Sequence, residues 1–177
     1  MIDNLFLGAE AGVNHSVALL RAETLDRPVQ ADTALVPGIV LSIDPEAKVG
    51  GTVTSVPGEL LSLALAPEGP VRWISLNIDL GVFDLTRLQT LAVICRCQAP
   101  QAATFRILLR SGIDGGFVDS QFRKTVVAYA EPSTHLDSVE IARDPQVPRG
   151  ATWRQIILLF EPAALDLKLL NFGLFAA

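Results

Sequence analysis

The chain has 177 residues, of which 50% are hydrophobic and 19% charged, and its formal net charge is −5. Such a chain can bury one substantial core, and its composition argues against disorder. Because binding to nucleic acid or to anionic lipid depends on a basic surface, the net charge argues against both partners. No apolar run approaches the ~18 residues that cross a bilayer, and the first residues lack a signal-peptide pattern. We therefore expect no membrane insertion, and a cytoplasmic protein or one that leaves as part of a released particle.

The first part of the sequence predicts short strands separated by turns. Strands are predicted at residues 16–21, 34–43, 52–56 and 59–66. Residues 1–15 form a possible N-terminal arm, and the polar stretch 22–32 predicts an extended connection. Pro37-Gly38 interrupts an apolar run, which predicts a bend or bulge at that point.

The stretch from Val71 to Tyr129 shows the clearest pattern. Strands are predicted at residues 71–80, 89–98, 104–110 and 122–130. In each, apolar residues alternate with polar or mixed ones, which is the period of a half-buried strand. The Gly- and Asp-rich residues 111–120 predict the longest loop of the chain.

The last part of the sequence predicts three more strands and completes a β-sheet protein. These strands lie at residues 138–143, 153–160 and 165–175. Trp153 begins an alternation and is predicted to lie in the core, whereas the last strand is apolar on both sides, which is one sign of burial against another subunit. Because strands recur at short intervals without a convincing amphipathic helix, we predict an all-β fold. Residues 1–177 would form a single antiparallel β-sandwich domain.

Several of these strands carry a pattern that resembles a known family. The pattern consists of Trp73-Ile74-Ser75-Leu76-Asn77-Ile78-Asp79-Leu80, Leu91-Ala92-Val93, residues 104–110 and residues 152–160. It resembles the jelly-roll sandwich of carbohydrate-binding modules and galactose-binding-like domains, over residues 71–175. The resemblance implies a jelly-roll fold and a glycan site on the concave face of one sheet. Many such modules have an acidic residue near a structural calcium in the last strand, where this sequence has Asn171.

The polar side of the central strands is the candidate binding surface. If these strands pair with matched faces, their outward polar and aromatic side chains share one surface. The candidate ligand-binding residues are Trp73, Asn77, Asp79, Arg96, Arg106, Arg110 and Tyr129. Aromatic rings pack on sugar rings, while Arg, Asn and Asp supply hydrogen-bond donors and acceptors for hydroxyl groups. The alternative is a solvated sheet face, or one that a neighbouring subunit covers.

The remaining reactive residues form no catalytic, cofactor or metal motif. Cys95 and Cys97 are the only cysteines and are predicted to be free, buried thiols, because bridging residues two apart in a strand needs strained geometry. His15 and His135 stand in loop-like contexts without a companion ligand and are predicted to lie at the surface.

Asp114 and Asp119 leave two interpretations open. Both flank a Gly-Gly pair, so they fit either calcium ligands or turn-forming residues. No metal and no cofactor is assigned from the sequence.

We interpret the sequence as a non-catalytic jelly-roll module that recognises an oligosaccharide or cell-surface glycan and forms a homo-oligomer. The alternative hypothesis is a structural component of a larger assembly, such as a head, spike or tail accessory protein of a phage-like particle. Its motivation is the high apolar fraction and the leucine-rich last strand, because such components bury apolar strands between subunits.

Overall fold

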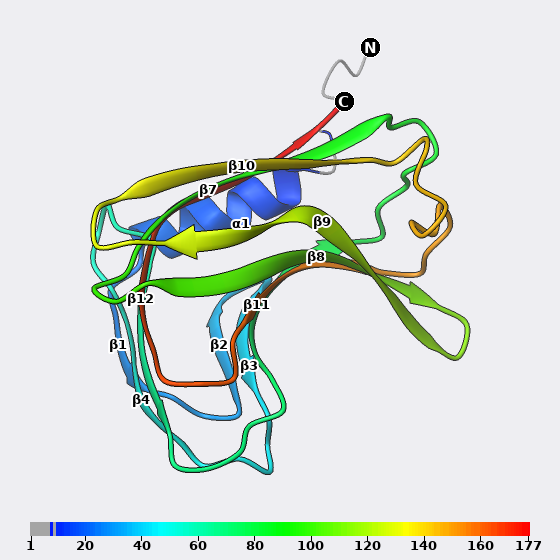
Figure 1. The fold of residues 1–177 in the computed structure, drawn as a ribbon. Coiled ribbons are helices and arrows are strands. Elements are labelled where there is room, and N and C mark those ends of the chain that lie inside the picture. Colours follow the sequence, from blue (N-terminus) through cyan, green and yellow to red (C-terminus); the bar gives the residue numbers. More distant parts are fainter. Residues whose placement is uncertain (1–7, 9) are drawn as a thin grey trace.

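A computed structural model describes residue 8 and residues 10–177, which form two stacked β-sheets and one helix (Figure 1). Sheet A contains, in spatial order, β1 (Leu25–Pro28), β4 (Val49–Ser55), β5 (Leu61–Pro67), β12 (Leu165–Ala176), β7 (Thr90–Gln98) and β10 (Ser133–Glu140). Sheet B contains β2 (Asp32–Val36), β3 (Ile39–Ile43), β6 (Ile74–Gly81), β11 (Arg154–Phe160), β8 (Ala103–Ile113) and β9 (Gly116–Ala128). Neighbouring strands pair antiparallel, which confirms the predicted jelly-roll β-sandwich.

The core lies between the two sheets and is built from the alternating apolar residues. Ile74, Leu76 and Ile78 of β6 all point inward and are buried, as predicted. Leu63 and Leu167 are buried on the facing side of sheet A. The four central strands do not belong to one sheet, however, because β7 is in sheet A whereas β6, β8 and β9 are in sheet B.

The predicted loop at residues 111–120 is instead a β-hairpin. β8 extends to Ile113, and β9 begins at Gly116, so that only Asp114 and Gly115 form the turn. Gly115 has a φ of 83°, which glycine adopts without steric cost, and Asp-Gly is a preferred two-residue hairpin turn. The hairpin projects beyond the other strands at the lower right of Figure 1.

The predicted first strand at residues 16–21 is wrong, because this segment belongs to helix α1 (Glu10–Ala22). Val13, Val17 and Leu20 are buried at the spacing of one helix face. The helix therefore also includes part of the predicted arm, while residues 1–7 and 9 lie outside the described residues.

Helix α1 packs against strands of both sheets, namely β12, β6 and β2. β5 pairs only with the first residues of β12, from Leu165 to Leu169. Farther along β12, the side chain of Asn14 in α1 forms hydrogen bonds with the backbone of Leu174. Its Nδ2 donates to the carbonyl of Leu174 (2.9 Å), and the Leu174 amide donates to its Oδ1 (3.0 Å). No helix in the described part of the chain is both long enough and apolar enough to cross a membrane.

A β-bulge explains why the last strand is apolar on both sides. The register of β12 against β7 shifts between Leu169 and Asn171. Side chains of opposite parity on the two sides of the bulge therefore point the same way. The buried side chains are Leu165, Leu167 and Leu169 before the bulge, and Phe172 and Leu174 after it. The core of a single chain accounts for this pattern, so it is no argument for a partner subunit.

The cysteines lie where the sequence predicts, but one histidine does not. Cys95 and Cys97 are free and fully buried, and a hydrogen bond with Cys97 together with burial raises the pKa of the Cys95 thiol. His15 is exposed on α1. His135 belongs to β10 instead of a loop and is half-buried, which lowers its pKa.

Candidate functional site

The outward face of sheet B contains a cleft with a volume of about 500 Å³. The cleft is lined by Ser42, Arg72, Trp73, Ser75, Asn77, Arg110, Phe117, Ile157 and Leu159. These residues come from β3, β6, β11, β8 and β9, and from the two positions that precede β6. Small-molecule sites in proteins typically range from 300 to 1,000 Å³, so the cleft has the size of a binding site.

Strand register explains how the floor of the cleft forms. Ile157 of β11 stands opposite Asn77 of β6 on one side and Leu108 of β8 on the other, and all three point outward. Ile157 is nevertheless only 1% exposed, because the surrounding side chains rise above it. With Leu159 beside it, the floor is aliphatic.

One wall of the cleft is an aromatic ring held together with a guanidinium group. The carboxylate of Asp44, after β3, accepts hydrogen bonds from Nε (2.7 Å) and Nη2 (2.6 Å) of Arg72. It also accepts the backbone N–H groups of Arg72 and Glu46, both at 3.1 Å. The side-chain bond with Arg72 holds the pKa of Asp44 well below its usual range. The guanidinium carbon lies 4.9 Å from the centroid of the Trp73 ring, so Asp44 fixes both residues.

The opposite wall repeats this arrangement on the β8–β9 hairpin. Arg110 donates from Nε and Nη2 to the two carboxylate oxygens of Asp119, each at 2.7 Å. Its guanidinium carbon lies 3.9 Å from the centroid of the Phe117 ring. A bidentate pair of this kind orients the planar guanidinium group and balances its charge. Both walls therefore present fixed N–H donors next to aromatic surface.

Asn77 contributes an unused hydrogen-bond acceptor to the cleft. Its Oδ1 is buried and accepts no hydrogen bond from the described residues. A buried polar atom without a partner costs about 1–3 kcal/mol, so nearly all such atoms in folded proteins are paired. A ligand hydroxyl group would satisfy this atom once the Asn77 amide turned toward the cleft.

The structure brings some of the predicted binding residues together. Trp73, Asn77 and Arg110 line the cleft. Asp79 and Arg106 point outward from the same sheet but do not line it: Asp79 stands opposite Gln155 and accepts the amide of Gly81 (3.0 Å), and Arg106 stands opposite Leu159 and Thr125.

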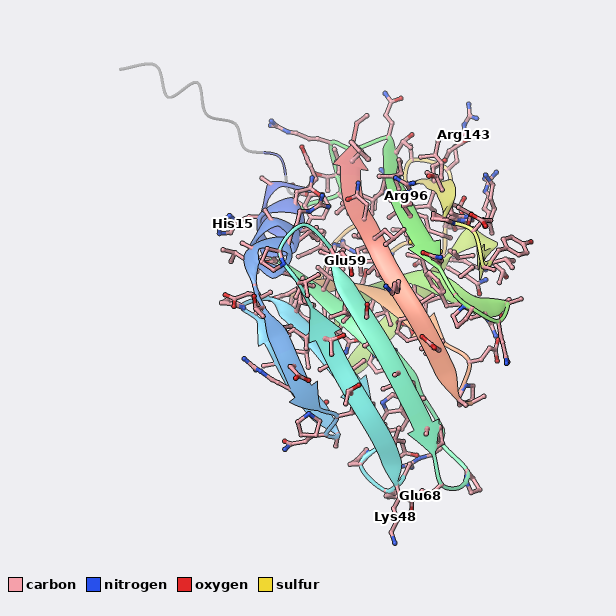
Figure 2. All side chains as sticks on the ribbon, turned by 90° about the vertical axis from the view of Figure 1, so that its left-hand side faces the viewer. His15, Lys48, Glu59, Glu68, Arg96 and Arg143 are labelled. Atoms are coloured by element: carbon pink, nitrogen blue, oxygen red, sulfur yellow. The ribbon has the colours of Figure 1, made fainter. Side chains whose placement is uncertain are left out.

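Two of the predicted residues lie elsewhere. Arg96 is on β7 and points outward from sheet A, as Figure 2 shows, so the prediction that it shares a surface with Arg106 and Arg110 is wrong. The chain crosses from sheet B to sheet A between β6 and β7, which strand alternation does not reveal. Tyr129 follows the end of β9 and is 53% exposed, outside the residues that line the cleft.

The two aspartates of the hairpin have separate positions. Asp119 binds Arg110 with both carboxylate oxygens, whereas Asp114 lies in the turn. The described residues contain no group of three or more His, Cys, Asp or Glu side chains that could hold a metal ion. The interpretation as a turn-forming residue fits Asp114 but not Asp119, which belongs to β9.

Other residues of the site were missed or misplaced by the sequence analysis. Phe117 was placed in a loop, although a hairpin with an Asp114-Gly115 turn puts it on the same face as Arg110. Nothing in the sequence marks Arg72 as a site residue, because its position depends on a hydrogen bond to Asp44, which lies 28 residues earlier in the chain. Trp153 is 37% exposed, so its predicted place in the core is wrong, because Arg154 takes the inward position beside it.

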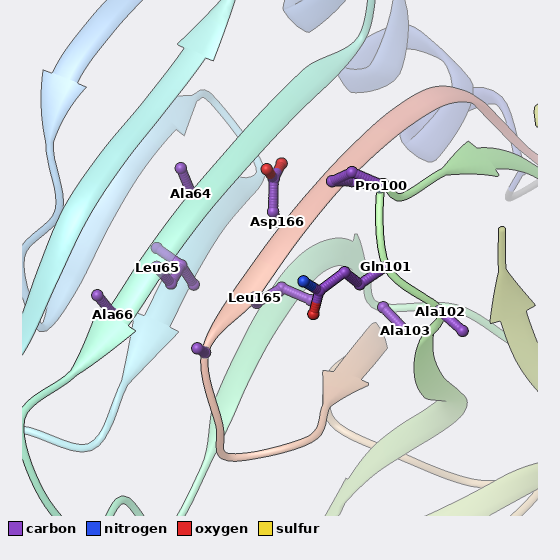
Figure 3. A pocket seen from close by; sticks show the side chains of 10 residues that line it. Ala64, Leu65, Ala66, Pro100, Gln101, Ala102, Ala103, Leu165 and Asp166 are labelled. Carbon is purple, nitrogen blue, oxygen red and sulfur yellow. The ribbon is translucent and has the colours of Figure 1, made fainter. Parts of the chain in front are cut away.

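A second pocket, of about 430 Å³, lies where β12 and β5 meet the connection between β7 and β8 (Figure 3). Alanine residues make up much of its lining, and its polar side chains come from Gln101 and Asp166. It contains no aromatic side chain. The cleft on sheet B is therefore the better-equipped site for an organic ligand.

Three solved structures are similar to this chain. The N-terminal cellulose-binding domain of Cellulomonas fimi β-1,4-glucanase C is 15% identical, with a TM-score of 0.54 over 85% of this chain and 97% of that one. The xylan-binding domain CBM22-1 from Paenibacillus barcinonensis Xyn10C is 11% identical, with a TM-score of 0.53 over 86% and 92%. A family 11 carbohydrate-binding module from Clostridium thermocellum, in complex with a β-1,3-1,4-mixed-linked tetrasaccharide, is 12% identical, with a TM-score of 0.51 over 88% and 98%.

The chain has the jelly-roll fold of carbohydrate-binding modules. This confirms the resemblance that the strand pattern predicted. No protein-family model matches the sequence, and no curated protein matches it. At 11–15% identity, the two binding domains and the module share the fold with this chain, and the ligand has to be argued from the cleft itself.

Proposed function

We propose that this protein is a non-catalytic carbohydrate-binding module that holds an oligosaccharide in the cleft on sheet B. The observation that carries the proposal is a single cleft in which the guanidinium group of Arg72 lies against Trp73 on one wall and that of Arg110 lies against Phe117 on the other. A sugar ring combines apolar C–H faces with hydroxyl groups at its edge. A site for it therefore needs apolar and aromatic surface together with a few fixed polar groups.

Each part of the cleft has a defined role in this proposal. The side chain of Asn77, which lines the cleft, forms a hydrogen bond with a sugar hydroxyl group. The aromatic walls and the aliphatic floor at Ile157 contact the C–H faces of the sugar rings. Arg72 and Arg110 donate, from N–H groups that their carboxylate partners leave free, to hydroxyl oxygens.

The carboxylates beside the cleft support binding without catalysis. A glycosidase needs a carboxylic acid with a raised pKa to protonate the leaving group. Asp44 has a lowered pKa and is bound by Arg72, and Asp119 is bound with both oxygens by Arg110. Neither is placed to donate a proton to a substrate.

The ion pairs also indicate the kind of glycan. Arg72 pairs with Asp44 and Glu46, and Arg110 pairs with Asp119, so the walls present little net positive charge to a ligand. We expect a neutral oligosaccharide, because an acidic one would have to compete with Asp44 and Asp119 for the guanidinium groups. Cellulose, xylan and mixed-linked glucan, which the names of the similar structures mention, are suitable first probes.

Titration calorimetry with soluble oligosaccharides of these three glycans tests the proposal. We expect one of these oligosaccharides to bind the unsubstituted protein. Phe117→Ala or Asn77→Ala should weaken binding about tenfold or more, which is the effect of truncating a central contact in other interfaces. Phe175→Ala is the matched control, because Phe175 is 54% exposed, like Phe117 at 52%, but points outward from sheet A. Binding that survives both cleft substitutions would refute the site.

The alternative of a particle component is not carried further. Its motivation was the high apolar fraction and the leucine-rich last strand, and the β-bulge of β12 accounts for the pattern of that strand within one chain. The same argument removes the main reason to expect a homo-oligomer.

A further inference from the structure

We infer that Trp153, whose indole ring packs on Gly112, is a further aromatic contact for the glycan outside the cleft, so that the protein prefers extended chains to short oligosaccharides. This inference rests on the proposed function and deepens it. It assigns a role to a tryptophan that is 37% exposed and does not line the cleft.

The position of the indole ring follows from the hairpin register. Gly112 and Phe117 are direct partners across the hairpin, so their side-chain directions point to the same face of sheet B. Gly112 has no side chain, and the pyrrole part of the Trp153 indole occupies the space where its Cβ would be. The indole therefore lies on the same face as Phe117, which lines the cleft.

The backbone on both sides of Trp153 is held firmly. The amide of Gly112 donates to the carbonyl of Trp153 (2.9 Å), and the amide of Thr152 donates to the carbonyl of Gly112 (3.0 Å). The next residue, Arg154, is fully buried and donates from Nε to the carbonyl of Phe83 (2.8 Å). A side chain that is exposed yet fixed in position loses little conformational entropy when a ligand packs on it.

Polar groups connect the cleft with Trp153. Asp79, Gln155 and Arg110 stand side by side on β6, β11 and β8, and all point outward between the cleft floor and the end of the sheet at which Trp153 lies. These three side chains offer hydrogen-bond acceptors and donors for the hydroxyl groups of a glycan chain that continues out of the cleft. Asp79, which the sequence analysis selected, thus belongs to this extension.

The inference is tested by the dependence of affinity on chain length. A trisaccharide and a hexasaccharide of the glycan that binds the natural sequence are titrated against it and against Trp153→Ala. We expect the natural sequence to bind the hexasaccharide more tightly. Trp153→Ala should lose about tenfold for the hexasaccharide, the effect of truncating an aromatic contact, with little change for the trisaccharide.

A second variant separates the position of the ring from its presence. Gly112→Ala keeps the tryptophan, but the added Cβ would clash with the indole ring and displace it. This variant should therefore also remove the preference for the hexasaccharide. Trp153→Phe, which keeps an aromatic ring, should retain part of that preference. Phe175→Ala controls for the loss of an exposed ring elsewhere.

The outcomes are distinct. If the natural sequence binds no glycan, the proposed function fails and this inference fails with it. If it binds and Phe117→Ala abolishes binding, but folded Trp153→Ala and Gly112→Ala keep the full length preference, the proposed function stands and this inference is overturned. Thermal unfolding of each variant shows that it is folded, and Trp153→Phe decides the question if Trp153→Ala does not fold.

Discussion

Replacing Arg154 with leucine should strongly destabilise the protein. The guanidinium group of Arg154 is buried and donates four hydrogen bonds: to the carbonyls of Phe83 (2.8 Å), Pro148 (2.6 Å) and Arg149 (2.7 Å), and to Oγ of Ser111. These bonds hold the connections from β6 to β7 and from β10 to β11 onto the end of sheet B. Leucine would leave all of these acceptors without this donor.

The expected magnitude follows from the number of bonds. A net contribution of about 1 kcal/mol for each hydrogen bond gives a loss of about 4 kcal/mol in the free energy of unfolding. Hydrogen bonds to a charged donor are individually stronger. Burial of the Arg154 charge is unfavourable, however, as its lowered pKa shows, and leucine removes that charge. Since natural domains are stable by about 5–15 kcal/mol, the loss is a large fraction of the total.

Urea unfolding followed by tryptophan fluorescence measures this loss, with Trp73 and Trp153 as the reporters. Arg143→Ala is the matched control, because Arg143 is exposed and, among the described residues, pairs only with Glu140 on the surface (3.2 Å). Its effect should stay within about 0.5 kcal/mol. A loss below about 1 kcal/mol for Arg154→Leu would refute the view that these four bonds hold the connections in place.

Three further predictions concern the cleft, the hairpin and the helix. Because the folded pKa of Asp44 is lowered, its ion pair with Arg72 should stabilise the protein fully above about pH 4 and lose this effect as the pH falls toward the folded pKa. Asp44→Asn should flatten this acid dependence in urea unfolding and weaken glycan binding; an unchanged acid profile would contradict the assignment. Gly115→Ala, at a φ of 83°, should cost about 1 kcal/mol in thermal unfolding, whereas Gly116→Ala should cost little, and equal effects would argue against the turn geometry. Asn14→Ala should lower the free energy of unfolding by about 1–2 kcal/mol through its two bonds to Leu174, and no loss would show that α1 does not need them.

Strand alternation predicted most of the fold because it is a local property. The inward residues of β6 were identified from their period alone, and the same reasoning located β7, β8 and β11. Membership of a sheet is not local, however, since it depends on where the chain crosses the sandwich. For this reason the sequence analysis placed Trp73, Asn77 and Arg110 correctly on one face but added Arg96 from the other sheet.

The remaining errors have equally specific causes. Helix α1 contains Gly12, Asn14 and Ser16, which are weak helix formers, and its stability comes from packing Val13, Val17 and Leu20 against both sheets. The bulge in β12 was missed because, in the sequence, the strand only looks apolar on both sides. The Asp44–Arg72 contact spans two strands and a turn, and neither residue alone shows that it forms.

The tip of the β8–β9 hairpin lies outside the strand pairing that holds β8 in sheet B. β8 pairs with β11 only as far as Ser111, so the tip of the hairpin extends past this pairing, and of the cleft residues Phe117 lies in this tip whereas Arg110 lies within the pairing. Two extra residues in each arm would preserve which side chains point outward, because the strand period is two. A change in the length of this arm would therefore move Phe117 and reshape the cleft, with little effect on the packing between the sheets.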